Sequence, residues 1–118
     1  MNVTNQVFEV LEGDDFAIEA GSYPAKFVSV DLKEEGKHGP YYEWTFDGSD
    51  KTYKGFADKP KGGPTIGNKL GRLLCGLAGR PLSAGQVNPK DYVGKPYMLV
   101  YAPNKKNGKV SLESITPM

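Results

Sequence analysis

The chain has 118 residues and a formal net charge of +1, with 15 Lys and Arg against 14 Asp and Glu and a single cysteine. This length suffices for one domain that buries about 65% of its unfolded surface, and the lone cysteine excludes an internal disulfide and a thiolate metal cage. The chain shows neither a basic leader with a long apolar run nor a stretch near the ~20 apolar residues of a membrane span, so we expect a cytoplasmic protein.

The first twenty residues differ in composition from the rest. Residues 1–20 hold five acids and no base, and we expect an acidic N-terminal arm or an extra strand there, followed by one folded domain over 21–118. Residues 1–50 carry three Lys against eleven Asp or Glu, whereas residues 51–118 carry twelve Lys or Arg against three acids. A fold that gathers the second half on one side would have a basic face despite its neutral total.

Three strand-like segments follow the acidic arm. They are predicted over residues 23–32, 41–46 and 52–56. In the second segment Tyr42, Trp44 and Phe46 recur with period two, which places all three on one face of a strand, most simply the core face. Gly55 in the third segment indicates a bulge or a close approach of another part of the chain.

The leucine spacing predicts one helix, over residues 68–78. Four leucines fall at i, i+3, i+4 and i+7 and form one apolar stripe: Leu70, Leu73, Leu74 and Leu77. Thr65 and Asn68 are both suitable N-caps, and Gly79 followed by Pro81 ends the helix. A helix with such a stripe needs an apolar surface to cover.

Two more strands are predicted after the helix, over residues 93–101 and 110–115, with a connecting loop over 82–92. The predicted fold is therefore mainly β, a five-stranded OB-fold-like barrel with one α-helix between strands 3 and 4. In such a fold the binding groove is lined by the third strand and by the loops that join strands 1–2 and 4–5.

Catalytic and metal chemistry have little support in the sequence. His38 is the only histidine and lies in a turn, and Cys75 lies inside the predicted helix, where a cysteine usually acts as a small buried hydrophobe. Residues 62–69 superficially resemble a phosphate-binding loop, but Asn68 stands where that loop needs Lys. We expect no enzymatic activity, no metal site and no cofactor.

Aromatic residues alternate with basic ones, which is the strongest functional pattern. Binding of single-stranded nucleic acid needs flat rings for base stacking and cations for the phosphates. We expect stacking on Tyr41, Tyr53, Phe56 and Tyr101 and phosphate contacts from Lys37, Lys54, Lys59, Lys61, Lys105, Lys106 and Lys109. The alternative is that Tyr53 or Phe56 belongs to the core and that the lysines only solvate the surface.

Four segments carry a resemblance to a known group of proteins: residues 21–27 (GSYPAKF), 41–46 (YYEWTF), 68–74 (NKLGRLL) and 92–100 (YVGKPYMLV). Their layout resembles that of small OB-fold proteins that bacteriophages and prophages encode near replication and recombination genes, many of which are described as single-stranded DNA-binding proteins. The resemblance covers most of residues 21–116. It implies sequence-tolerant, non-catalytic DNA binding in the cytoplasm of a bacterial host.

The sequence therefore predicts a monomer or weak oligomer that binds single-stranded DNA, with RNA as the alternative ligand, as an accessory to phage-type replication or recombination proteins. A second hypothesis is a protein-interaction module of a phage or mobile-element assembly, in which the same rings contact a partner protein. A continuous positive groove would favour nucleic acid, whereas an apolar patch with mixed charge would favour a protein partner. An enzyme is the third choice, because the sequence supplies no evident set of catalytic polar groups.

Overall fold

The computed structural model describes residues 18–34, 39–65, 67–80, 87–105 and 108–118. Its elements are β1 (Gly21–Lys33), β2 (Tyr41–Asp47), β3 (Thr52–Asp58), the helix α2 (Lys69–Ala78), the short 3-10 helix η3 (Pro89–Tyr92), β4 (Pro96–Pro103) and β5 (Val110–Pro117). The predicted N-terminal arm falls almost entirely outside the described residues. Over the residues that the structure describes, the protein is mainly β, with five strands and one α-helix.

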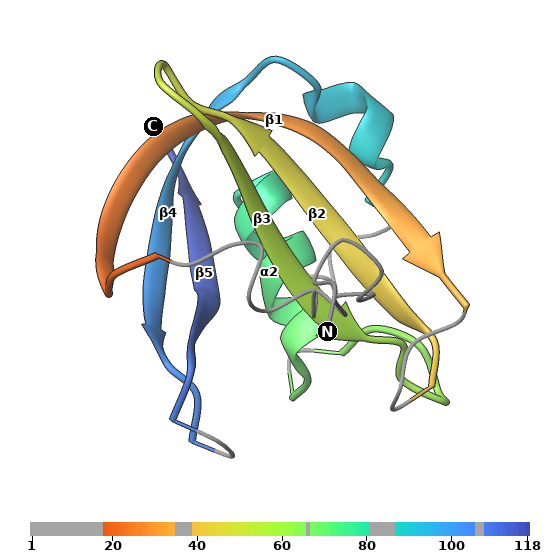
Figure 1. Cartoon of the computed structure of the whole chain (residues 1–118). Helices are drawn as coiled ribbons and strands as arrows, with labels where there is room; N and C mark the ends of the chain where they lie inside the picture. Colours follow the sequence, from red (N-terminus) through yellow and green to blue (C-terminus); the bar gives the residue numbers. More distant parts are fainter. Residues whose placement is uncertain (1–17, 35–38, 66, 81–86, 106–107) are drawn as a thin grey trace, which may run out of the picture.

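The five strands form one antiparallel sheet in the order β3-β2-β1-β4-β5. The central strand β1 is long enough to pair twice: its first half pairs with β4 and its second half pairs with β2. Its register with β2 shifts between Phe27 and Ser29, and Phe27 exchanges backbone hydrogen bonds with Gly94 and Lys95 just before β4. β1 therefore arches across the molecule and joins the two halves of the sheet (Figure 1).

The predicted closed barrel is not confirmed, because β3 and β5 are the two edges of the sheet and do not pair with each other. Side chains bridge the space between these edges. The ring hydroxyl of Tyr101 donates a hydrogen bond of 2.6 Å to the carbonyl oxygen of Lys54 on β3. Gly55 lies so close to Leu112 that a Cβ atom on the glycine would collide with the leucine side chain. Gly55 was expected to mark either a β-bulge or a close approach of another part of the chain. The β2–β3 register has no shift, so there is no bulge at Gly55, and the close approach is the correct alternative.

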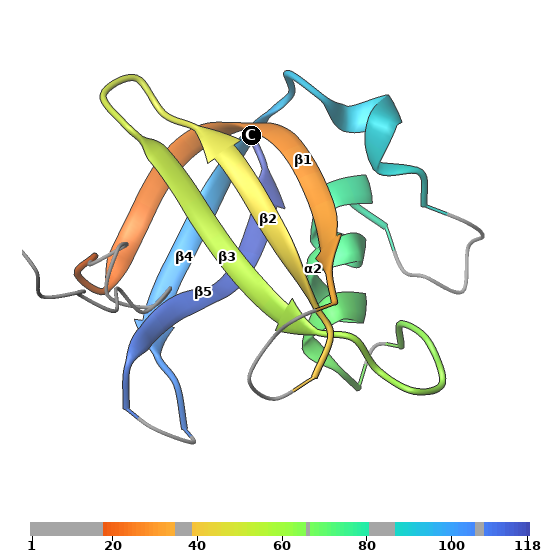
Figure 2. The same ribbon diagram turned by 45° about the vertical axis from the view of Figure 1, so that its right-hand side comes forward.

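The core lies inside the arch of the sheet, where α2 also lies (Figure 2). Trp44 and Phe46 have no exposed surface, and Tyr42 is half-buried beside them, so the predicted core face of β2 is confirmed. The leucine stripe of α2 also faces the core as predicted. Leu70, Leu73 and Leu77 are buried, and Leu74 is half-buried. Burial of large side chains of this kind stabilises a fold by about 1.5–3 kcal/mol each.

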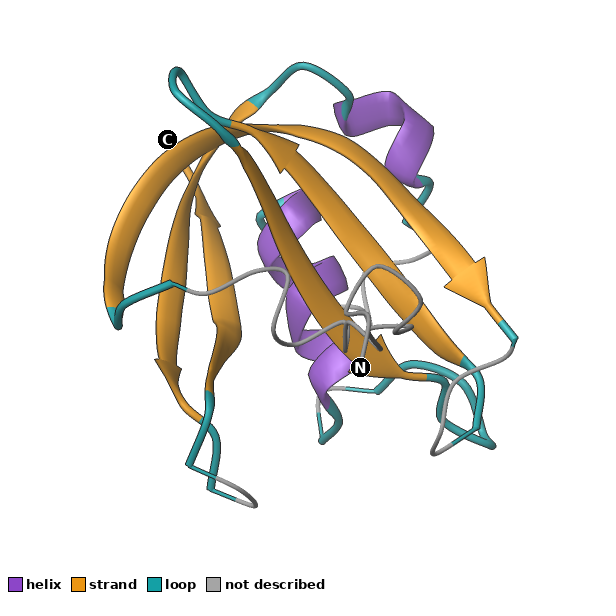
Figure 3. Cartoon of the chain, in the orientation of Figure 1, coloured by secondary structure: helices purple, strands orange, loops and turns teal. Residues whose placement is uncertain are grey.

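The helix begins and ends as its residue types require. Asn68 is the N-cap, and its side-chain oxygen accepts a hydrogen bond from the Gly71 amide at 2.8 Å, while Gly79 ends the helix in the left-handed conformation. Gly76 faces β5, and a Cβ atom there would collide with the carbonyl group of Ile115. Glycine at position 76 is thus explained by close packing of α2 on β5 (Figure 3).

The predicted strand over 93–101 is wrong at its start. β4 begins at Pro96, and the preceding residues form η3 and a turn, because Asn88 caps the short helix by accepting a hydrogen bond from the Lys90 amide at 3.1 Å. Pro89 at the first position of η3 has the backbone angle that a helix start needs.

Among the described residues, no helix has the length and apolar character needed to cross a membrane.

Candidate functional site

The surface that we call the outer face consists of the outward-facing residues of β1, β2 and β3. The pairing registers arrange them in three cross-strand rows: Lys33, Tyr41 and Asp58; Asp31, Glu43 and Phe56; Ser29, Thr45 and Lys54. None of the nine is buried, whereas Trp44 and Gly55, which alternate with them along β2 and β3, are. Side chains directly opposite each other in such rows have Cβ atoms about 4.5–5.5 Å apart, so each row acts as one contact surface.

Two aromatic side chains meet on this face. The rings of Tyr41 on β2 and Phe56 on β3 lie 5.9 Å apart between centroids, at an interplanar angle of 61°. This edge-to-face geometry is favourable for aromatic pairs and fixes both rings on the sheet surface. Both side chains are half-buried, so part of each ring remains exposed to solvent. Of the four predicted stacking residues, these two are the ones that face outward.

Lys54, which was predicted to contact phosphates, forms an ion pair with a carboxylate of its own sheet. Its Nζ lies 3.0 Å from Oε1 of Glu43, and the two side chains are 35% and 17% exposed. A charge-assisted hydrogen bond at this distance, away from full solvent, competes with any phosphate for the ammonium group. Lys54 therefore has a structural partner that sequence reasoning did not anticipate.

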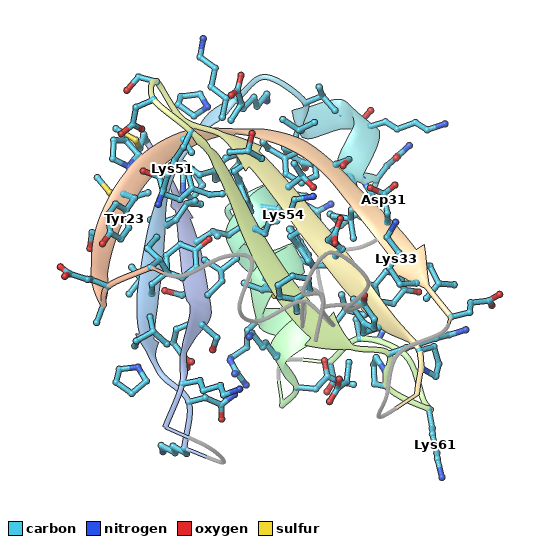
Figure 4. All side chains as sticks on the ribbon, viewed as in Figure 1. Tyr23, Asp31, Lys33, Lys51, Lys54 and Lys61 are labelled. Atoms are coloured by element: carbon cyan, nitrogen blue, oxygen red, sulfur yellow. The ribbon has the colours of Figure 1, made fainter. Side chains whose placement is uncertain are left out.

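Three lysines gather where β1 and β3 end. Lys33 is the last residue of β1 and lies in the same row as Tyr41, and Lys59 and Lys61 follow β3 directly. The Lys59 amide donates a hydrogen bond of 3.0 Å to the carbonyl oxygen of Pro40, which ties the β3–α2 connection to the start of β2. All three lysines are exposed. In Figure 4, Lys54 lies partway along β3, Lys33 near the end of β1 and Lys61 beyond the sheet.

The other predicted lysines belong to different places. Lys105 and Lys109 are exposed in the β4–β5 connection, whereas Lys37 and Lys106 lie outside the described residues. The β4–β5 connection and the β3–α2 connection are at the same end of the molecule but on opposite sides of it (Figures 1 and 2). Lys59 and Lys61 are therefore separate from Lys105 and Lys109, and these four predicted lysines do not line one continuous groove.

The stacking role predicted for Tyr53 and Tyr101 is wrong, because the two side chains are only 5% and 2% exposed. They point into the arch of the sheet and form a cluster with Tyr23, in which ring centroids are 5.5 to 6.3 Å apart. Burial raises the pKa of both the Tyr53 and Tyr101 phenols above the usual range. A base cannot stack on rings that other rings cover, so these two tyrosines belong to the core.

The predicted set of phosphate-contacting residues leaves out three cations, which are Lys33 on β1 and Lys69 and Arg72 on α2. Lys33 could have been found from the hairpin pairing, because a turn over 34–40 places it opposite Tyr41. Lys69 and Arg72 lie on α2, and Nη2 of Arg72 lies 4.0 Å from Oε1 of Glu113 on β5. Burial lowers the pKa of Lys69, although the negative charge of Glu113 acts in the opposite direction. Their position depends on how α2 packs on the sheet, which the helix pattern alone does not give.

Among the residues that the structure describes, no three His, Cys, Asp or Glu side chains are grouped so that they could hold a metal ion. Comparison of the chain with protein-family models, with curated proteins and with solved structures finds no significant match. The features that bear on function are therefore the outer face and the lysines beside it.

Proposed function

We propose that the chain is an OB-fold-like, non-enzymatic protein that binds single-stranded DNA on its outer face. The fold part of this proposal is supported by the strand order β3-β2-β1-β4-β5, by the helix between β3 and β4, and by the contact of Gly55 with Leu112 across the open edges. OB-folds bind oligonucleotides on the face of their second and third strands. In this chain that face carries the half-buried ring pair of Tyr41 and Phe56.

The observation that carries the proposal is the position of Tyr41 and Phe56 next to exposed lysines. A base stacked on such a ring contributes about 1–3 kcal/mol, and stacking tolerates any sequence because every base has a flat face. Lys33, Lys59 and Lys61 lie at the end of the same strands and would pair with the phosphates of a strand that crosses this end. Lys105 and Lys109 lie on the opposite side of the molecule and would contact phosphates only of a strand long enough to reach the β4–β5 connection.

The biological setting follows from the resemblance described above, which suggests an accessory role in phage-type replication or recombination inside a bacterial cell. RNA is the alternative ligand, because stacking and phosphate contacts are common to both polymers. A preference for DNA would have to come from contacts that distinguish the sugar, and comparison of matched DNA and RNA strands measures it directly.

The test is fluorescence titration of a labelled single-stranded oligonucleotide at two salt concentrations. Tyr41→Thr keeps a β-forming residue but removes the ring, and about 5- to 150-fold weaker binding is expected from the loss of one stacked base. Tyr41→Phe keeps the ring and is the matched control, with binding close to that of the native protein. Absence of binding at low salt would refute the proposal, and so would equal binding by both variants.

A second candidate function has one specific observation in its favour. The outer face carries the carboxylates Asp31, Glu43 and Asp58 beside Lys33 and Lys54, so its own charge is mixed rather than positive. Mixed charge around exposed rings suits a non-catalytic module that contacts a partner protein. Failure of the native protein to bind any single strand at low salt would favour this candidate.

A further inference from the structure

The middle row of the outer face combines one ring with two carboxylates. Asp31 on β1 lies opposite Glu43 on β2, and Glu43 lies opposite Phe56 on β3. Ser29 Oγ donates a hydrogen bond of 3.0 Å to Oδ2 of Asp31, and Lys54 Nζ donates one of 3.0 Å to Oε1 of Glu43. These contacts use one oxygen of each carboxylate, and the second oxygen still accepts hydrogen bonds. The two acceptors are thus held by side chains of the neighbouring row and lie in the same row as the ring of Phe56.

The carboxylates divide the face into a part that suits bases and a part that suits phosphates. Asp31 and Glu43 repel a phosphate, whereas Lys33, Lys59 and Lys61 at the end of the strands attract it. A bound strand then lowers its energy when its backbone follows the lysines and its bases turn toward the middle row. A base that stacks on Phe56 in this orientation presents its polar edge to Glu43 and Asp31.

Carboxylates discriminate between polar edges of bases. Cytosine has an amino group at position 4, from which Asp and Glu accept hydrogen bonds, whereas uracil and thymine have a carbonyl oxygen there, which a carboxylate repels. We infer that Asp31 and Glu43 give this protein a preference for strands whose bases carry an exocyclic amino group, with cytosine favoured over uracil and thymine. The inference rests on the proposed function, since it concerns the same surface.

The test compares short single-stranded tracts of deoxycytidine and deoxyuridine of equal length at neutral pH, measured by fluorescence anisotropy with the full chain. The two bases are the same size and both lack the thymine methyl group, so the comparison isolates the polar edge. We expect the deoxycytidine tract to bind about fivefold tighter or more, which is the low end of what one discriminating side chain to base contact gives.

Two variants assign the preference to the carboxylates. Asp31→Asn keeps an oxygen that accepts from Ser29, and Glu43→Gln keeps the shape of the side chain while releasing Lys54 from its ion pair. Overall affinity is expected to rise in both variants, because a negative charge is removed from the face. The ratio between the two tracts should fall toward one in both. Asp47→Asn, an exposed carboxylate at the far end of β2, changes the net charge equally and should keep the ratio.

The outcomes separate this inference from the proposed function. A cytosine preference that is lost in Asp31→Asn and Glu43→Gln but kept in Asp47→Asn supports the inference. Equal binding of the two tracts by the native protein overturns it while leaving single-strand binding intact, and a preference that both variants retain overturns the assignment to these residues. Binding of neither tract overturns the proposed function and this inference together.

Discussion

Tyr101 on β4 donates a hydrogen bond of 2.6 Å from its ring hydroxyl to the backbone carbonyl oxygen of Lys54 on β3. The two residues belong to opposite halves of the sheet, and β3 and β4 are not neighbours in it. The bond therefore satisfies a carbonyl group at an open sheet edge that no strand pairs with. It also explains why the ring of Tyr101 points inward, where it contacts Tyr23 and Tyr53.

Removing this hydroxyl should destabilise the fold without weakening ligand binding. Tyr101→Phe keeps the buried ring but leaves the Lys54 carbonyl without this donor, and we expect the free energy of unfolding to fall by about 1–2 kcal/mol. Denaturant unfolding followed by fluorescence measures this, because Trp44 is the only tryptophan and is fully buried. Tyr92→Phe, on the half-buried ring of η3, is the control and should change stability by less than about 0.5 kcal/mol. A Tyr101→Phe protein as stable as the native one would contradict the structural role of the bond.

The buried tyrosines also predict how stability depends on pH. Burial raises the pKa of Tyr97 and Tyr101 above the usual value of 10.0, and each hydroxyl donates to a backbone carbonyl at 2.6 Å. Above about pH 10 the unfolded chain loses these protons while the folded chain keeps them, so the contribution of the two tyrosines to stability should be constant below that pH and fall above it. Unfolding midpoints measured across the alkaline range check this, and Tyr101→Phe should show a shallower decline. Stability that rises above pH 10 would rule this explanation out.

Much of the fold could be predicted from spacing alone. The period-two pattern of Trp44 and Phe46 and the leucine stripe of α2 gave the correct buried faces, because burial selects residues on one side of an element. The start of β4 could not be predicted in this way. Val93 has high β-propensity, but the Asn88 cap and Pro89 favour a helical turn before it, and local capping prevailed over propensity.

The candidate site was harder to predict because its residues belong to both faces of the same strands. Tyr53 and Phe56 are three residues apart on β3, so one must point inward and the other outward, and the sequence alone did not say which. The hydrogen bond of Tyr101 depends on how two strands that are distant in the sequence meet, and the ion pair of Lys54 depends on the register between β2 and β3. Such contacts have no counterpart in local sequence patterns.

The glycine at the helix–sheet contact leads to a prediction against helix propensity. In an exposed helix, replacement of Gly by Ala stabilises by about 1 kcal/mol, but Gly76→Ala would drive a methyl group into the Ile115 carbonyl. We expect Gly76→Ala to destabilise the protein by about 1–3 kcal/mol, as overpacking does. Thermal or denaturant unfolding measures the change. Gly62→Ala is the control, since an added Cβ atom meets nothing within 4 Å there. A stabilised Gly76→Ala protein would show that α2 packs less closely on β5 than the structure indicates.

The lysines beside the outer face lead to a prediction about salt dependence. If Lys59 and Lys61 each neutralise one phosphate, their joint replacement by Ala should reduce the steepness of log K against log salt by about 1.4, since each contact with a single strand contributes about 0.7. Oligonucleotide titrations at several salt concentrations give this slope. The matched control replaces Lys90 and Lys95, which are exposed and belong to η3 and the turn that precedes β4, and the slope should then stay unchanged. An equal decrease in both double variants would show that the protein attracts phosphates through its overall charge, whereas a decrease confined to the first assigns the phosphate path to the end of β3.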